Sequence, residues 1–446
     1  MFVSEKLGRF TAEFHTATPS AEVIHHAKRA LVDWYGALLA GYSMAPTPMV
    51  ENALALELDQ GKARLPLGRL AATRAAALIN GTASHTAEVD DIYREAIYHP
   101  GAPTFSAAMA VGQALDVSGL EFLKAAIAGY ETSTRIGQVM GRAHYQHWHN
   151  TGTVGTFGAT TAAAYLLKLN AEQTANALSL SATFAAGLQQ AFKMDSLAKP
   201  LHSGRAAEAG VTAAMLAQQG VISSLDVFEG EVGLGRTMSD GPDWSLAFDD
   251  LGARFNINSM TFKNHACCGH TFAPIDGALE LQTRHGIAAD DIERIVVATY
   301  APAIAVAGNP QPVTAPEARF SIPFVVSTAL LHGSVRLAAF DAERLQSPAI
   351  RALMQRIELQ VEPSLDAQFP GQRAAQVTIR TKDGKEFSML QPTRKGDPDM
   401  PLSDTELNDK FSELALPVLG ANKSNTLSTA LWNMDAESTL SALGKK

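Results

Sequence analysis

Apolar residues recur at helical spacing through the first half of the chain. Between Ala21 and Ala40 they are separated mostly by three or four positions, and Ser20 is a residue type that commonly caps a helix start. Similar Ala/Leu-rich segments follow at 104–116, 120–138, 154–168, 171–191 and 204–218. Several of them are apolar on nearly every side, which is typical of helices buried in a large helical core. The pattern predicts a helical domain.

The pattern changes near residue 256. Ile292–Tyr300 and Arg356–Val361 are rich in β-branched residues and predict strands. Two further strand-like runs, 377–381 and 385–390, flank Asp383-Gly384, a strong hairpin signal. Helical patterns lie at 272–285, 318–332, 403–415 and 424–443.

These elements predict a mainly α fold with two domains. A large all-helical domain is built from both chain ends, residues 1–255 and 396–446. It is interrupted by a smaller α+β domain, residues 256–395, which we expect to act as a lid. A chain of 446 residues is long enough for two domains of this kind.

Composition and charge narrow the choice of partners and location. The formal net charge of −9 argues against a nucleic-acid partner. No run approaches the roughly 18 apolar residues of a membrane span, and the first residues lack the apolar run of a signal peptide. The two cysteines, Cys267 and Cys268, are adjacent and poorly placed for a disulfide, so burial is their expected role. We expect a cytoplasmic protein without membrane or nucleic-acid partners.

Histidines are concentrated in four segments that also contain Gly, Pro or Asn. The segments are HTAEVDDIYREAIYHPGAP from His85, HYQHWHNTGTVG from His144, KPLHSGRAAEAG from Lys199 and FKNHACCGH from Phe262. Their composition indicates loops or helix starts rather than helix middles. An acidic protein that binds an acidic substrate needs a local positive pocket, which makes these Lys/His clusters candidates for a site.

The four segments together resemble the MmgE/PrpD family. Members of that family show HALDFDDT…HPSAP, GWHPTGTFG, KPLHAGRAAEAG and KPYPCCRYTHPAID in the same order, and Lys199–Gly210 is a nearly verbatim match. The resemblance extends over nearly the whole chain, including ARFSIPF at Ala318–Phe324. It implies a homodimer with the architecture given above. Known members include 2-methylcitrate dehydratase, cis-aconitate decarboxylase and iminodisuccinate epimerase.

The resemblance also implies site residues. The candidate catalytic residues are His99, His149, Lys199 and Lys263, which match family active-site positions. The candidate substrate-binding residues are Glu88, Asp91, Ile92, Arg205 and Phe324. Asp90 matches a further acidic family position. An Asp in such a segment more often caps a helix or orients a neighbour, and an Arg like Arg205 more often forms a surface ion pair.

This sequence departs from the family pattern at several of these positions. Glu88 stands where an Asp is usual, and Asn150 replaces the common Pro. Ile92 replaces a Thr and Phe324 replaces the Tyr of cis-aconitate decarboxylases, so two hydroxyls are lost. We therefore expect a substrate other than cis-aconitate or 2-methylcitrate.

The residue types fit proton chemistry beside a carboxylate. Negative charge develops on an enolate-like intermediate, which lysine ammonium groups stabilise, and histidine moves protons near pH 7. A His close to Lys199 or Lys263 should have a lowered pKa because a like charge disfavours protonation. We expect His149 at a helix start and Lys199, which precedes Pro200, in an extended backbone.

Metal and organic cofactors are not expected. An aconitase-type cluster needs cysteines at three or more positions, and this chain has two. The histidines of the run His144, His147 and His149 could suggest zinc, but no carboxylate lies near them in sequence, and the resemblance implies no metal. No phosphate-binding glycine motif is present.

The sequence therefore predicts a cofactor-independent lyase of the dehydratase type that acts on a small di- or tricarboxylate. One alternative is an epimerase or racemase at a carbon next to a carboxylate, which needs two acid/base groups on opposite faces. Another is a catalytically inactive binding protein with the same fold. Retained lysines argue against the last, since a buried, unused Lys costs stability.

Overall fold

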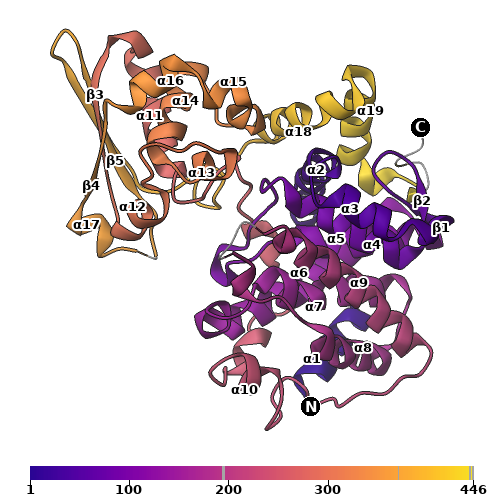
Figure 1. Cartoon of the computed structure of the whole chain (residues 1–446). Helices are drawn as coiled ribbons and strands as arrows, with labels where there is room; N and C mark the ends of the chain where they lie inside the picture. Colours follow the sequence, from indigo (N-terminus) through magenta and orange to yellow (C-terminus); the bar gives the residue numbers. More distant parts are fainter. Residues whose placement is uncertain (193–195, 370, 441–442, 444–446) are drawn as a thin grey trace. The chain divides into compact units, whose positions relative to one another are not determined.

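The computed structural model describes residues 1–192, 196–369, 371–440 and 443. The chain forms two compact units, which we call unit 1 (Met1–Phe262 with Ser403–Lys446) and unit 2 (Lys263–Leu402). The sequence predicts the second unit at 256–395, whereas the structure has its limits at Lys263 and Leu402. Figure 1 labels the elements of both units.

Unit 1 is almost entirely helical, which confirms the predicted fold class. Its helices are α1 (Val3–Glu13), α2 (Ala21–Tyr42), α3 (Thr47–Ala53), α4 (Thr73–Thr86), α5 (Gly101–Leu115), α6 (Gly119–Tyr145), α7 (Asn150–Leu166), α8 (Ala171–Phe184), α9 (Ala198–Gln218), α10 (Leu234–Met238), α18 (Asp404–Leu419) and α19 (Ala421–Trp432). A small antiparallel pair, β1 (Leu58–Arg64) and β2 (Leu70–Ala71), accompanies them.

Helix α7 lies at the centre of unit 1. Every residue from Asn150 to Leu166 is buried, as its all-round apolar and small-residue sequence predicts. It packs against α5, α6 and α9. Close approach depends on glycines: a Cβ atom on Gly158 would crowd the side chains of Thr104 and Ser133. The start of this central helix is therefore surrounded by other elements.

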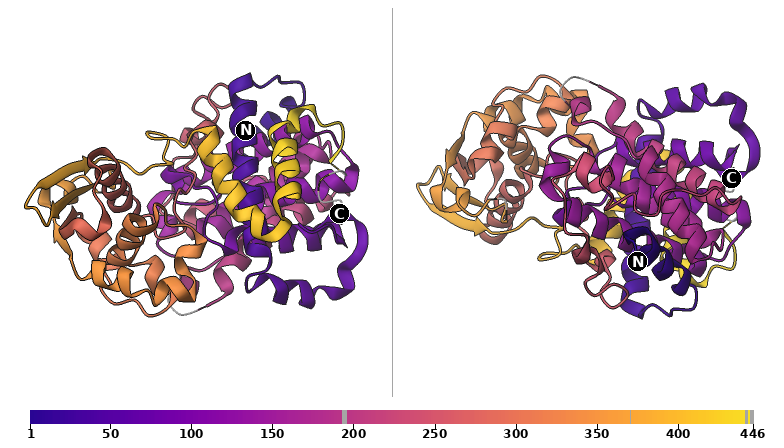
Figure 2. Two further views of the ribbon diagram at one scale, coloured as in Figure 1. Left: turned by 90° about the horizontal axis from the view of Figure 1, so that it is seen from above. Right: turned by 90° about the horizontal axis from the view of Figure 1, so that it is seen from below.

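The two ends of the chain meet in unit 1. Helix α18 packs along α2, and Figure 2 shows the C-terminal helices α18 and α19 beside the N-terminal helices. Lys410 of α18 donates hydrogen bonds to a carboxylate oxygen of Asp33 at 2.5 Å and to the carbonyl of Val89 at 2.6 Å. Both charged side chains are buried. This pairing fixes the C-terminal segment to the N-terminal part of the unit.

Unit 2 is an α+β unit built on a four-stranded sheet of order β4-β3-β5-β6. The strands are β3 (Ile292–Thr299), β4 (Ile357–Val361), β5 (Ala375–Thr381) and β6 (Glu386–Gln391). Strands β3 and β4 are parallel, and the other neighbours are antiparallel. Gly384 has a positive φ of 82° in the β5–β6 turn, which confirms the hairpin predicted from Asp383-Gly384.

Helices cover one face of this sheet. Helix α11 packs on β5 and β6 and is followed outward by α14 and α16 (Figure 1). Alternate residues of β5, among them Val377 and Ile379, are buried, as period-two alternation predicts. The helices of unit 2 are α11 (Phe272–His285), α12 (Ala301–Ala307), α13 (Ala315–Arg319), α14 (Ile322–His332), α15 (Ala342–Leu345), α16 (Pro348–Met354) and α17 (Pro363–Asp366).

Across the described ranges of both units, none of the helices combines the length and apolar character required to cross a bilayer.

Candidate active site

A turn after helix α4 joins two histidines to one carboxylate. His85 lies in the last turn of α4, and Glu88 adopts a left-handed conformation with φ of 60°. The chain then returns so that Asp90 Oδ2 lies 2.7 Å from His85 Nδ1. His99 Nδ1 lies 3.3 Å from the same oxygen. A single buried carboxylate therefore holds both imidazole rings.

His149 caps the start of α7, which confirms the predicted helix start. Its backbone N–H donates to the carbonyl of Gly187 at 2.8 Å, and its side chain is buried. The His149 ring stacks on His85 with centroids 5.5 Å apart. On its other side, His149 Nδ1 lies 3.1 Å from His202 Nδ1. One of these two nitrogens must donate and the other accept, so the two tautomers are coupled.

Lys199 reaches the same cluster from α9. Its Nζ forms an ion pair with Glu88 and lies 5.7 Å from the centroid of Phe192. The Phe192 ring in turn meets His149 edge-on at 4.9 Å. The expected extended backbone of Lys199 is wrong, because Lys199 lies in the first turn of α9. Pro200 is accommodated there because the N–H groups of a first turn have no helical partner.

Burial and neighbouring cations set the protonation of these groups. Burial, followed by His85, Lys199, His99 and His202, lowers the pKa of His149 well below its usual value. The prediction that Lys199 would depress the pKa of a nearby histidine is therefore confirmed in direction, although burial is the larger cause. Burial also lowers the pKa of His202, with help from His85 and Lys199.

Asp90 shows the opposite balance. Burial raises the pKa of its carboxyl, but His99 and His85, by charge and hydrogen bonding, more than offset burial and hold this pKa well below its usual value. Asp90 is therefore a carboxylate anion. The cluster thus places a neutral histidine, His149, near His99, whose Nδ1 side faces an anion.

Asp91 and Ile92 lie on the neighbouring backbone. Asp91 accepts hydrogen bonds from the Gly101 N–H at 3.0 Å and from the Tyr130 hydroxyl at 2.7 Å, which caps the start of α5. Burial and Asp33 raise its pKa to about 8. Both its oxygens are thus engaged inside unit 1. Ile92 is partly buried and pairs with Thr261 through backbone hydrogen bonds of 2.8 and 2.9 Å.

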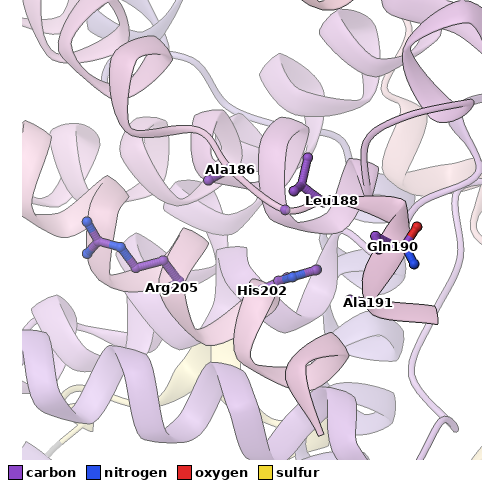
Figure 3. Close-up of a pocket in the computed structure, with 7 residues that line it drawn as sticks. Ala186, Leu188, Gln190, Ala191, His202 and Arg205 are labelled. Carbon is purple, nitrogen blue, oxygen red and sulfur yellow. The ribbon is translucent and has the colours of Figure 1, made fainter. Parts of the chain in front are cut away.

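Arg205 lies six residues beyond Lys199 on α9, at the rim of a cavity of about 400 Å³. Its side chain is 54% exposed and paired with Glu208, which is the surface ion pair considered as its alternative role. The cavity is also lined by His202 and the 186–191 segment, and Figure 3 shows the guanidinium extending away from the His202 ring. His202 therefore connects this cavity to His149.

Lys263 and Phe324 belong to unit 2. Lys263 is buried close to Cys267, whose thiol is also buried and lies 3.0 Å from the Thr271 hydroxyl. The Phe324 ring is buried inside unit 2, 6.1 Å from the Phe340 ring. The structure thus brings together His99, His149, Lys199 and Glu88 in unit 1. Roles for Lys263 and Phe324 at the same site stay predictions.

One group of side chains has the composition of a metal site. Ligand atoms of His85, Asp90 and His99 lie within 4.8 Å of one another. The separation of 2.7 Å between His85 and Asp90 is that of a hydrogen bond, whereas two ligands of a tetrahedral zinc ion are about 3.3 Å apart. His144 of the HxxHxH run instead contacts the Met238 carbonyl at 2.9 Å and the Thr153 hydroxyl at 2.7 Å.

Two members of the cluster, His85 and His202, received no role from the sequence. His202 follows Lys199 by three positions in KPLH, so a helix there places both on one face, which was an available signal. His85 and Asp90 are five residues apart and come into contact across a turn in which Glu88 is left-handed. Their pairing was therefore not readable from spacing.

Comparison with known proteins identifies the family. Residues 5–247 match the MmgE/PrpD N-terminal domain and residues 265–436 match the MmgE/PrpD C-terminal domain. The cis-aconitate decarboxylase-like protein oryM of Aspergillus oryzae is 25% identical, over 99% of this chain and 96% of its own length. Human cis-aconitate decarboxylase is 28% identical over 81% of this chain and 76% of its own. The Aspergillus terreus enzyme of the same name is 21% identical over 99% and 95%. The first match lies within unit 1, and the second covers unit 2 and continues through α18 and α19 of unit 1. Together the two matches span most of the sequence, and the chain belongs to the MmgE/PrpD family.

Proposed function

We propose that this protein is a lyase that acts on a small di- or tricarboxylate by proton transfer next to a carboxylate, without a cofactor. The observation that carries the proposal is the pairing of a neutral, buried His149 with an Asp90-bound His99 beside Lys199. A buried imidazole with a lowered pKa suits a base, and an imidazole held by a carboxylate is positioned to act as its acid partner. The names of the relatives, cis-aconitate decarboxylases, support a lyase of carboxylates.

The roles follow from the environments. His149 accepts a proton from the carbon next to a substrate carboxylate, and the C–H electron pair forms an enolate-like anion. Lys199 stabilises that anion electrostatically, which requires that the substrate carboxylate replace Glu88 as its partner. In a dehydration, His99 then protonates the leaving hydroxyl, the C–O bond breaks, and water departs as the C=C bond forms. Lys263 is proposed as a second cation.

Decarboxylation uses the same groups differently. The C–C bond to a carboxylate breaks, carbon dioxide leaves, and the electron pair remains as a stabilised carbanion. A protonated histidine then delivers a proton to carbon. Both reactions need one charge-stabilising cation and one proton-moving imidazole, so the cluster supports a lyase without distinguishing between them. The relatives' names favour decarboxylation, whereas the dehydratase type is our first expectation from the sequence.

The substrate is proposed to differ from cis-aconitate, despite the names of the relatives. Ile92 and Phe324 replace two hydroxyl side chains, and a site that lacks such groups discriminates against a substrate whose polar groups would be left unpaired. Rates on cis-aconitate and 2-methylcitrate should be at least about tenfold below those on the best acid found. Equal rates on either would remove this part of the proposal.

The deciding experiment is incubation with a panel of carboxylic acids in deuterated water, followed by NMR. A new alkene indicates dehydration, carbon dioxide release indicates decarboxylation, and deuterium exchange with inversion indicates the epimerase alternative, which two neighbouring imidazoles also support. His149→Gln, purified identically, controls for contaminating enzymes. Activity that survives extensive chelation supports cofactor independence, and activity restored only by added metal contradicts it. If no acid reacts, the binding-protein alternative is favoured. A cytoplasmic homodimer stays a prediction.

A further inference from the structure

The loop before α11 brings two arginines together within unit 2. A Cβ atom on Gly269 would lie 2.8 Å from Nη1 of Arg394 and 3.8 Å from Nη1 of Arg373. Arg373 precedes β5 and Arg394 follows β6, and these two strands are neighbours in the sheet. Both guanidinium groups therefore lie near the backbone of Gly269. A side chain at position 269 would occupy the space next to them.

The two arginines differ in how their charge is balanced. Arg394 is 1% exposed and donates from Nε and Nη2 to the Asp397 carboxylate at 2.9 and 2.8 Å. Arg373 is partly buried. Among the residues that the structure describes, none accepts a hydrogen bond from Arg373 and no carboxylate lies within ion-pair distance of it. Asp397, the ion-pair partner of Arg394, also acts electrostatically on Arg373 but does not contact it, so one carboxylate serves two guanidinium groups.

Apart from Asp397, neutral polar and aromatic groups surround the pair. His270 Nδ1 lies 2.7 Å from the Tyr300 hydroxyl, and Tyr300 stacks on Phe369 with centroids 4.6 Å apart. Burial, then Arg373 and Arg394, lowers the pKa of His270 to about 4, so this ring is neutral near pH 7. Burial and Arg394 also lower the pKa of Arg373. Both pKa shifts are consistent with the guanidinium groups of Arg373 and Arg394 lying close to each other and to His270.

Two close like charges, only one of them paired, are costly unless an anion compensates them. The planar fork of an arginine matches the oxygens of a carboxylate or a phosphate. We propose that Arg373 and Arg394, at the open backbone of Gly269, bind a small oxyanion group, a carboxylate or a phosphate. This proposal concerns binding and uses none of the groups assigned to proton transfer, so it stands apart from the proposed reaction.

Calorimetric titration of the full chain tests the site. Malonate and inorganic phosphate are titrated separately at fixed ionic strength into the Lys199→Ala variant, so that the cation of the unit 1 cluster does not contribute. At least one of them should bind with a Kd below about 1 mM. Adding Arg373→Gln should weaken binding about tenfold or more. The matched control is Arg380→Gln, because Arg380 lies on β5 but is exposed and paired with Glu293 at 3.1 Å.

The tighter of the two probes identifies the ligand class. Thermal melting gives an independent measure. Without oxyanion, the Lys199→Ala variant that also carries Arg373→Gln should melt at a higher temperature than its parent, the Lys199→Ala variant, because repulsion between Arg373 and Arg394 is removed. The successful probe should raise the melting temperature of the parent and not that of Arg373→Gln. The proposal is overturned if Arg373→Gln binds both probes as its parent does, or if neither probe binds more tightly than chloride.

Discussion

At position 149, burial and four ionisable neighbours act in the same direction on one imidazole. All of them disfavour its protonation, so His149 holds a free lone pair near pH 7. His202 shares one of its nitrogens and opens onto the cavity beside α9. His149 is therefore suited to accept a proton in the resting state and to pass it on to His202.

Replacing His149 by Gln should lower kcat about 100-fold or more while leaving KM within a few-fold, because general acid–base catalysis acts on the transition state. Rate-versus-concentration curves on the substrate found by the NMR screen measure both constants. Near-normal turnover of His149→Gln would instead make His99 the leading base.

Lys199→Ala should behave differently. A charge contact acts on the bound substrate as well as on the transition state, so KM should rise and kcat should fall together. The same curves check this expectation. Lys168→Ala is a suitable control, since Lys168 is an exposed lysine of unit 1 paired with Glu121. A Lys199→Ala enzyme with unchanged KM would contradict the assigned role.

Asp91 makes a prediction about pH and stability. Its pKa is about 8 in the folded protein and near 3.8 in the unfolded chain. Between these values only the unfolded state ionises, so folding stability falls as pH rises from about 4 to 8. Asp91→Asn removes this dependence. The melting temperature of Asp91→Asn minus that of wild type should therefore increase from pH 5 to pH 8. If this difference does not change with pH, the raised pKa of Asp91 is refuted.

At the scale of elements, the contact between α4 and α9 aligns the cluster, since α4 carries His85 and α9 carries Lys199 and His202. Gly204 makes this contact possible, because a Cβ atom there would overlap the Leu78 carbonyl and the Thr82 hydroxyl. The backbone oxygen cannot move aside as a flexible side chain can. Gly81 of α4 faces the same contact, since a Cβ atom there would lie 2.8 Å from the Gly204 Cα, so the separation of the two helices depends on two missing side chains.

Gly204→Ala should therefore lower the free energy of unfolding by about 1–3 kcal/mol, the usual cost of overpacking, and should lower kcat by misaligning α9. Denaturant titration and turnover measure the two effects. Gly36→Ala is the matched control in α2, because the atom nearest to its added Cβ is a Leu414 methyl group at 3.3 Å, which can shift. Equal stability of Gly204→Ala and wild type would show that the helices can separate without cost.

The elements that the sequence predicts best are those with a local cause. The helix expected at 272–285 is found as α11, and Asp383-Gly384 specifies the β5–β6 hairpin through a left-handed glycine. Helix α4 was missed, because TRAAALINGTASHT contains Asn-Gly and small polar residues and is buried on most sides. Parallel pairing of β3 with β4 depends on long-range contacts, which no local pattern encodes.

The candidate site was only partly readable from the sequence. Motifs with distinctive neighbours singled out His99, His149 and Lys199, which the structure brings together, and their roles stay predictions. The partners Asp90 with His85, and His149 with His202, come from different segments or cross a left-handed turn. Residue spacing does not specify such contacts, so the hydrogen-bonded network became visible only in the folded chain.

At the scale of the whole molecule, the pairing of Lys410 with Asp33 joins segments that are 377 residues apart. Lys410→Met should cost about 3–5 kcal/mol in unfolding free energy, because it leaves a buried carboxylate without its cation. Combining it with Asp33→Leu should recover much of that loss, since neither charge then remains. Chemical denaturation of the two single variants and the double variant checks this cycle, and additive losses would contradict direct coupling.

The same arrangement constrains how the protein is made. Asp33 and the surface of α2 pack against α18, which is translated only after all of unit 2. Until then these parts of the N-terminal segment lack their packing partner. Unit 2 is continuous in sequence and all its residues emerge before α18 does. The N-terminal helices must therefore remain incomplete, with an apolar surface open to chaperones or to aggregation, until synthesis is nearly finished. Slow translation or early termination near residue 402 should be tolerated poorly by this fold.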